Sequence, residues 1–307
     1  KDAHAPMTAS ANAARANRPG VGIAFALAST LLYGVVPAGT GLAFKDGVSP
    51  IEVTFIRTLV VAVGMALIVL AQGAKIRLPR DHLGAFALQA LATLVISVGF
   101  LGAVAFIPVS LTILIFYTFP ILTLISAPFV EGKKLSLAEM AAVGLAFIGL
   151  GVAVGPSFSV LDWRGIALAG AASVGVVAQF HCARKLGGAM APAVQGFLIH
   201  AAILPVTLIL ALWVGEGRLG FITQSGMQGQ IALALVGVCY LTAFFLHMSA
   251  LVAAPASTVV PFYNLEPVIS MIMAALLVGE YLSPVQYAGV GLVLGGLLIA
   301  SLAGRRA

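Results

Sequence analysis

The chain has 307 residues, of which 61% are hydrophobic and only 8% carry a formal charge. A soluble domain carries roughly 25% charged residues and needs them for its hydrated surface. This composition excludes a soluble globular protein and indicates an integral membrane protein. The net charge of +6 does not indicate nucleic-acid binding, because the basic residues form short clusters between apolar runs.

The length of the apolar runs predicts helices rather than the strands of a barrel. Leu83–Val130 and Leu219–Leu265 contain no charged residue, and each run is long enough for two helices of about 20 residues. We predict an all-α integral membrane fold with ten transmembrane helices. Their expected positions are Val21–Phe44, Ile51–Gln72, His82–Phe106, Val109–Val130, Ser136–Val154, Trp163–Ala183, Ala191–Val214, Gly229–Val252, Ala256–Val278 and Ser283–Leu302.

The sequence repeats itself after 147 residues. Pro108–Leu150 aligns with Pro255–Leu297 without a gap, and 14 of the 43 positions are identical. We therefore expect a first repeat at 21–155 and a second at 156–304, preceded by a flexible cytoplasmic tail at 1–20. Each repeat has five helices, and an odd number gives the two halves opposite orientations. The predicted architecture is a 5+5 inverted repeat.

The basic residues predict how the chain lies in the membrane. If both termini are cytoplasmic, the inner segments hold 12 Lys and Arg residues and the outer segments hold only Lys45, Arg164 and Arg218. Cytoplasmic loops are enriched in Lys and Arg, so both termini are expected to be cytoplasmic. The expected location is the cell membrane, specifically the inner membrane of a bacterium.

Several local motifs resemble the EamA-type permeases of the drug/metabolite transporter superfamily. They are Leu32-Tyr33-Gly34, Phe55-Ile56-Arg57, and the repeat endings that begin at Phe119-Pro120 and Glu266-Pro267. The resemblance implies a secondary transporter of a small metabolite, often an exporter, whose cavity is lined by helices 1, 3, 4, 6, 8 and 9. The first repeat departs from the family, because Lys133 and Phe119 stand where the second repeat has Glu280 and Glu266.

Matching prolines mark the middle of the fourth and ninth predicted helices. Proline has no amide hydrogen, so Pro120 and Pro267 leave the carbonyls of Phe116 and Tyr263 without their helical donors. Broken backbone at membrane depth occurs where it lines a cavity or is buried in protein. A simple packing kink is the alternative. The expected substrate-binding residues around these kinks are Tyr33, Phe116, Tyr117, Gln179, His247, Phe262, Tyr263, Asn264 and Glu266.

Each intramembrane polar residue also has a purely structural interpretation. Arg57 lies close enough to the outer end of its helix to extend to water, although it could also pair with Glu266. His200 and His247 are more often hydrogen-bonded core residues than proton carriers, and Gln179 could simply link two helices. The GxxxG spacing of Gly291 and Gly295 predicts close helix packing.

These observations favour a secondary transporter that works by alternating access around a midplane cavity. The expected substrate is a small amphipathic metabolite such as an amino acid, and export is the expected direction. The alternatives are an intramembrane enzyme or a passive channel. We expect no enzymatic activity, no cofactor and no metal, because the histidines lack ligand spacing and no phosphate-binding loop is present. The expected partners are the substrate and the lipid bilayer, without nucleic acid. Coupling to a proton or counter-substrate is possible in either a monomer or a homodimer.

Overall fold

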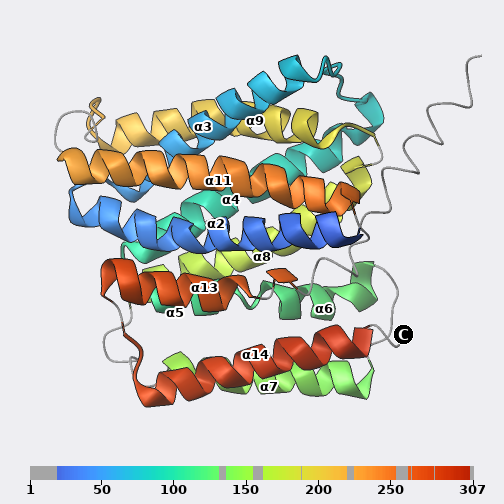
Figure 1. Ribbon diagram of the computed structural model, residues 1–307, viewed down its shortest axis with the longest axis vertical. Helices are drawn as coiled ribbons and strands as arrows, with labels where there is room; N and C mark the ends of the chain where they lie inside the picture. The colour runs from blue at the N-terminus through green and yellow to red at the C-terminus, as the bar shows by residue number, and fades with distance from the viewer. Residues whose placement is uncertain are drawn as a thin grey trace, which may run out of the picture.

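The computed structural model describes residues 19–130, 136–154, 162–187, 189–219, 225–253, 262–263, 265–279 and 281–304. The regular elements in these ranges are all helical (Figure 1), which confirms the all-α membrane fold class. They are α2 (Pro19–Lys45), α3 (Pro50–Ala71), η1 (Arg80–His82), α4 (Leu83–Val104), α5 (Val109–Phe116), α6 (Phe119–Val130), α7 (Leu137–Val154), α8 (Trp163–Gly187), α9 (Pro192–Val214), α11 (Met227–Ala253), α13 (Glu266–Met273), η3 (Ala274–Val278) and α14 (Pro284–Gly304).

Two of the ten predicted spans are discontinuous. The fourth span consists of α5 and α6, which are separated at Tyr117 and Thr118. In the ninth span, α13 begins at Glu266 and continues as the π-helical stretch η3. The other described helices begin and end within a few residues of the predicted limits.

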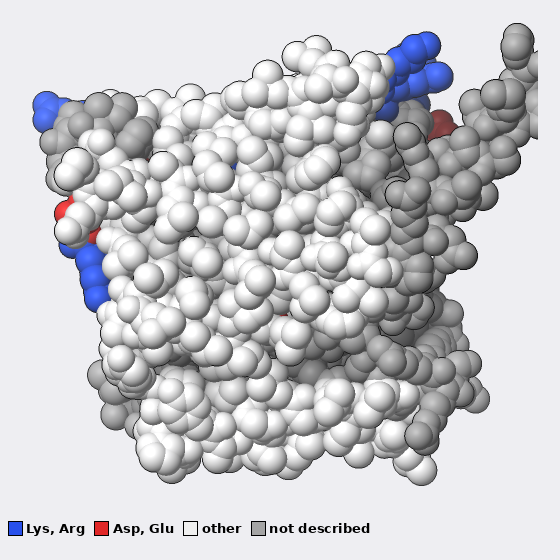
Figure 2. Space-filling model, viewed as in Figure 1, with Lys and Arg blue, Asp and Glu red and all other residues white. Residues whose placement is uncertain are grey.

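The surface of the bundle suits a bilayer. Five described helices are long and apolar enough to cross a membrane by length and composition, and shorter apolar helices accompany them. Large apolar side chains such as Leu67, Leu70 and Ile209 are exposed on their outer faces. Figure 2 shows Lys, Arg, Asp and Glu gathered mainly at the two ends of the molecule, with a broad uncharged band between them. A multi-pass membrane protein accounts for this distribution.

Helix pairing has the two-fold pattern of a duplicated unit. In the repeat, α2 corresponds to α8 and α4 corresponds to α11. The packed pair of α2 and α11 therefore corresponds to the packed pair of α8 and α4. The remaining major pairs, α3 with α9 and α7 with α14, join each helix to its own counterpart. Most of the extensive packing therefore runs between the repeats rather than within one of them.

Contacts at the helix ends fix the relative directions of the helices. At the end of α2, the Asp46 carboxylate accepts a hydrogen bond of 2.6 Å from the Gly229 amide near the start of α11. Lys45 donates a 2.7 Å bond to the Val278 carbonyl at the end of η3. Arg164, near the start of α8, lies over the ring of Phe106, just beyond α4. Both α2–α11 and α4–α8 are thus antiparallel, and the start of α2 and the end of α14 lie at the same end of the bundle (Figure 1).

Asp162 lies just before α8, outside the helix. Arg164 donates hydrogen bonds to both of its carboxylate oxygens, the shorter at 2.6 Å, and its backbone amide donates another at 2.8 Å. These hydrogen bonds lower the pKa of the Asp162 carboxyl below its usual value.

Small residues allow α7 and α14 to approach closely, although the predicted pair does not lie in the contact. A Cβ added to Gly149 would lie 2.7 Å from the Gly289 carbonyl oxygen, and one added to Gly296 would lie 2.8 Å from the Ala142 carbonyl oxygen. A Cβ on Gly291 would meet nothing within 4 Å. The prediction is therefore wrong for Gly291, while a Cβ on Gly295 would make an ordinary 3.8 Å contact with Leu145 of α7. The closest approach is set by Gly289 and Gly296, seven residues apart.

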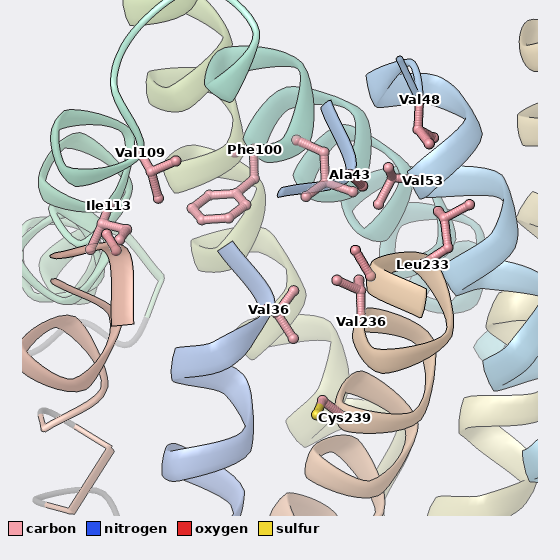
Figure 3. Packing of buried hydrophobic residues seen from close by; sticks show 14 of the residues in the cluster. Val36, Ala43, Val48, Val53, Phe100, Val109, Ile113, Leu233, Val236 and Cys239 are labelled. Carbon is pink, nitrogen blue, oxygen red and sulfur yellow. The ribbon is translucent and has the colours of Figure 1, made fainter. Parts of the chain in front are cut away.

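The largest buried apolar cluster lies where α2, α3, α4, α5 and α11 meet (Figure 3). We call it the central cluster. Residues far apart in the sequence come together here because both repeats contribute to it. Its labelled members in Figure 3 are Val36, Ala43, Val48, Val53, Phe100, Val109, Ile113, Leu233, Val236 and Cys239.

Candidate functional site

The site is built around two half-helices that begin at equivalent positions. The first residue of α6 is Phe119 and the first residue of α13 is Glu266, which are 147 residues apart and therefore match in the repeat. Each is followed directly by a proline, Pro120 or Pro267. Proline cannot supply the amide hydrogen that a continuous helix requires at that place, which fits helices that begin at Phe119 and Glu266.

Glu266 is the acidic residue of the first turn of α13. A carboxylate is stabilised at a helix N-terminus by the exposed amide groups and by the helix dipole. Its carboxyl group interacts electrostatically with the hydroxyls of Tyr33 on α2 and Tyr117 after α5. The half-helix start therefore places an ionisable group among polar aromatic side chains from both repeats.

A chain of ring contacts extends from this acid toward α11. The ring of Tyr33 makes edge contacts with Tyr240 and His247, with centroids 5.5 and 6.2 Å apart. His247 stacks on Tyr263 with a centroid separation of 4.4 Å. The Tyr263 hydroxyl donates a 3.4 Å hydrogen bond to the His247 carbonyl, which links the residues before α13 to α11.

Arg57 lies beside this chain rather than at the membrane surface. Only 5% of the residue is exposed, and its guanidinium carbon lies 4.2 Å from the centroid of the Tyr240 ring. It also interacts electrostatically with Tyr33. The expectation that Arg57 extends to water is therefore wrong, because the rotation of α3 directs this residue toward α11 and not toward the outer end.

A second group of rings borders the break between α5 and α6. Phe116 makes edge contacts with Phe100 of α4 and with Tyr117, at centroid distances of 4.7 and 5.4 Å. Phe119 lies 5.6 Å from Phe116 and 5.5 Å from Tyr117. In the first repeat, an aromatic ring thus occupies the position that Glu266 has in the second.

The remaining predicted site residues lie in different surroundings. Gln179 on α8 donates a 2.8 Å hydrogen bond to Thr93 on α4, so its observed contact is a link between helices. Phe262 packs with Phe25, Ala26 and Ala250 beside the start of α2. Asn264 lies outside the described residues, and so does the side chain of Pro120.

His200 has an ordinary buried contact, whereas the buried Nδ1 of His247 has no hydrogen-bond partner among the described residues. His200 on α9 donates from Nδ1 to the Gly196 carbonyl at 2.8 Å, and its ring lies 6.4 Å from that of Tyr240. Within the described part of the chain, no three His, Cys, Asp or Glu side chains are grouped as metal ligands would be.

Sequence reasoning missed Tyr240, although it is the residue that joins Arg57, Tyr33 and His200. Tyr240 lies in an apolar run without a neighbouring motif, so its environment depends on the pairing of α2 with α11. The repeat offers one signal for Tyr240. It lies 147 residues after Thr93 and so has the position in α11 that Thr93, a residue hydrogen-bonded to another helix, has in α4.

A family model for the EamA-like transporter family matches residues 20–155 and 163–302. The chain belongs to the EamA-like transporter family. The two matched segments together cover nearly all of the helical bundle; the first spans the predicted first repeat, 21–155, and the second lies within the predicted second repeat, 156–304. The resemblance expected from the motifs is confirmed, and the family places this multi-pass protein among membrane transporters.

Two further similarities agree with this assignment. The chain is 32% identical over 85 residues to the protein named "Uncharacterized transporter YwfM" of Bacillus subtilis (strain 168). The alignment spans 28% of this chain and 28% of that relative. A solved crystal structure, named only as that of a protein, has a TM-score of 0.70, 17% identity and covers 94% of this chain and all of its own. That structure supports the fold alone.

Proposed function

We propose that this EamA-like protein is a secondary transporter that exports a small amphipathic metabolite, such as an amino acid. Transport would proceed by alternating access, with the two repeats rocking about a site near the middle of the membrane. The observation that carries the proposal is the position of Glu266, at the first turn of a half-helix and among aromatic side chains of both repeats.

The chemistry of this position suits a transport site better than a packing kink. A charged group in the membrane costs about 2.5–3.5 kcal/mol or more unless it is paired or hydrated. The equivalent residue of the first repeat, Phe119, begins its half-helix without an acid. A carboxylate is therefore not required to form the break, and Glu266 needs another reason to be there. Binding a substrate amine or a coupling proton is such a reason.

The surroundings of Glu266 fit a small amphipathic ligand. Tyr33, Tyr117 and Tyr263 offer flat apolar surfaces together with hydroxyl groups, and Arg57 supplies a single positive charge. A large polyanion would require several cations. Among the described residues named here around Glu266, Arg57 is the one cation, so a small molecule with an apolar part is the better fit.

Replacing Glu266 by Gln tests the proposal, because it keeps the size and hydrogen bonding of the side chain but removes the charge. We expect E266Q to fold normally and to lose transport, or to lose the pH dependence of transport between about pH 5.5 and 8. E216Q is the matched control, because Glu216 is an acid in the turn after α9, outside the cluster. Unchanged transport by E266Q over this pH range would assign Glu266 to bracing the kink.

A further inference from the structure

Arg57 is a buried cation that contacts an aromatic face rather than an anion. Among the described residues, the ion pair within 4.0 Å is between Arg164 and Asp162, and no carboxylate pairs with Arg57. Its neighbours are the rings of Tyr240 and, at longer range, Tyr33 and His200. A guanidinium group has five N–H donors, and an aromatic ring satisfies none of them as an anion would.

A cation in this position needs a negatively charged partner. Cation–π contacts contribute about 0.5–2 kcal/mol, whereas the charge at membrane depth costs more than this. The planar guanidinium is suited to binding a carboxylate through two parallel hydrogen bonds. Arg57 therefore has the chemistry of an anion-binding residue, and Tyr240 holds its plane in place.

The position of Arg57 relative to Glu266 narrows the class of ligand. Tyr33 interacts electrostatically with both the cation on α3 and the acid on α13, and its ring contacts that of Tyr240, over which Arg57 lies. The two charges do not form an ion pair with each other. A ligand next to Tyr33 would therefore be near both a positive charge and an acid.

We infer that the Arg57 guanidinium binds the carboxylate of a zwitterionic substrate whose ammonium group faces Glu266. This inference rests on the proposed transport function and adds the polarity with which the substrate lies in the site. The carboxylate lies toward α3 and α11, the ammonium toward α13, and the apolar part against the tyrosine rings. Arg57 is then a residue that selects for an α-amino acid over an amine.

Binding by the purified protein in detergent tests this assignment. The probes are L-leucine, L-phenylalanine and L-threonine, each compared with its carboxamide, which keeps the ammonium and the side chain but removes the negative charge. We expect the wild-type protein to bind at least one free amino acid about tenfold more tightly than its amide. In R57Q the two forms should bind equally weakly, and R57K should be intermediate because lysine lacks the planar fork.

R164Q is the matched control. Arg164 also lies over an aromatic ring, that of Phe106 at 4.5 Å, but it is exposed at the start of α8 and bonded to Asp162. It should discriminate between acid and amide as the wild type does. The thermal unfolding of each variant without ligand shows whether it folds, and the wild-type comparison of acid with amide remains decisive if R57Q does not.

Three results would overturn the inference. Equal binding of acid and amide by the wild type, or full discrimination by R57Q, would show that Arg57 does not bind the carboxylate. Stabilisation by chloride over gluconate that R57Q abolishes would make chloride the counter-ion. Failure of every amino acid, while another metabolite is transported, would reject the zwitterion and leave the proposed transport function standing.

Discussion

The Tyr117 side chain is 4% exposed, and its hydroxyl interacts with the Glu266 carboxyl through a side-chain hydrogen bond. A buried hydroxyl that bonds a carboxyl is either part of a ligand site or a brace for the start of α13. Its place between Phe116, Phe119 and Glu266 favours a ligand.

Tyr117→Phe separates these explanations because it removes only the oxygen. We expect the protein to fold and its thermal stability to fall by no more than the contribution of one hydrogen bond, about 0.5–1.5 kcal/mol. Substrate affinity should fall by about 0.5–1.5 kcal/mol, or roughly 2- to 12-fold. Thr112→Val is the control, since it also removes a buried hydroxyl of α5, one without a hydrogen-bond partner in the described chain. An affinity unchanged in Tyr117→Phe would remove Tyr117 from the site.

Other repeated residues have a structural explanation that the motif alone did not reveal. Ser136 and Ser283, which match in the repeat, each cap the start of a helix. The Ser136 amide donates a hydrogen bond of 2.7 Å to the Glu139 side chain, and the Ser283 amide donates one of 2.9 Å to the Gln286 side chain. In return, each serine hydroxyl accepts a hydrogen bond from the backbone amide of the residue three positions later. These reciprocal bonds are capping boxes, so this part of the family pattern serves helix initiation.

At the residue level, local chemistry predicts where a helix is interrupted, whereas helix rotation decides the surroundings of Arg57. The kinks follow directly from the missing amide hydrogens of Pro120 and Pro267. The surroundings of Arg57 depend on which face of α3 meets α11, a contact between residues more than 180 positions apart. Snorkelling and burial are equally compatible with the local sequence of α3, so only the tertiary arrangement distinguishes them.

Between elements, the two repeats differ in how equivalent helix pairs are joined. Gln195 on α9 donates a 2.8 Å hydrogen bond to Gln89 on α4. In the repeat, Gln195 aligns with Val53, which is 142 residues earlier, and Gln89 aligns with Val236, which is 147 residues later. Both valines belong to the central cluster (Figure 3). At these positions α4 and α9 are therefore joined by an amide hydrogen bond, whereas the corresponding positions of α11 and α3 carry aliphatic side chains.

A second pair of polar residues shows the same difference between the repeats. Gln179 donates a hydrogen bond to Thr93, whereas the corresponding residues, Val36 and Tyr240, lie in or against the central cluster. The polar pairs join α4 to α8 and α9, whereas the apolar pairs join α11 to α2 and α3. Equivalent helix pairs of the two repeats are thus joined by different interactions, hydrogen bonds in one set and apolar packing in the other.

This difference predicts a double-mutant result for the amide pair. Gln195→Leu alone should destabilise the protein by about 0.5–2 kcal/mol, because it leaves the buried Gln89 side chain without its partner. Changing both residues to Leu should recover part of that loss. The measurement is thermal unfolding in detergent with substrate absent. Effects that simply add would show that the hydrogen bond does not couple the two helices.

For the whole molecule, the antiparallel pairs and the shared end of α2 and α14 agree with an inverted repeat of five helices. The helix positions were predictable because each span must bury about 20 apolar residues in the bilayer. Which helix packs against which was not predictable, because apolar stripes of similar composition can pack against several neighbours. The side of the membrane on which the shared end lies remains a prediction from the basic residues.

Labelling of introduced cysteines tests that orientation. Both native cysteines are buried, and they are replaced by alanine to provide a silent background, C182A/C239A. In intact cells, a cysteine at Lys75 should resist an impermeant thiol reagent, and one at Arg218 should react. Both positions lie between helices and are exposed, so access should depend on the side of the membrane alone. The opposite pattern would reverse the orientation and with it the assignment of the outer end.

Counterflow in proteoliposomes tests the central claim of transport by alternating access most directly. Vesicles are loaded with an unlabelled amino acid that binds the purified protein, and a trace of the labelled compound is added outside. We predict that the label accumulates transiently above its equilibrium level with the wild-type protein and that E266Q reduces this overshoot. A steady approach to equilibrium without overshoot would contradict the account and indicate a channel, and recovery of a chemically altered label would indicate an enzyme.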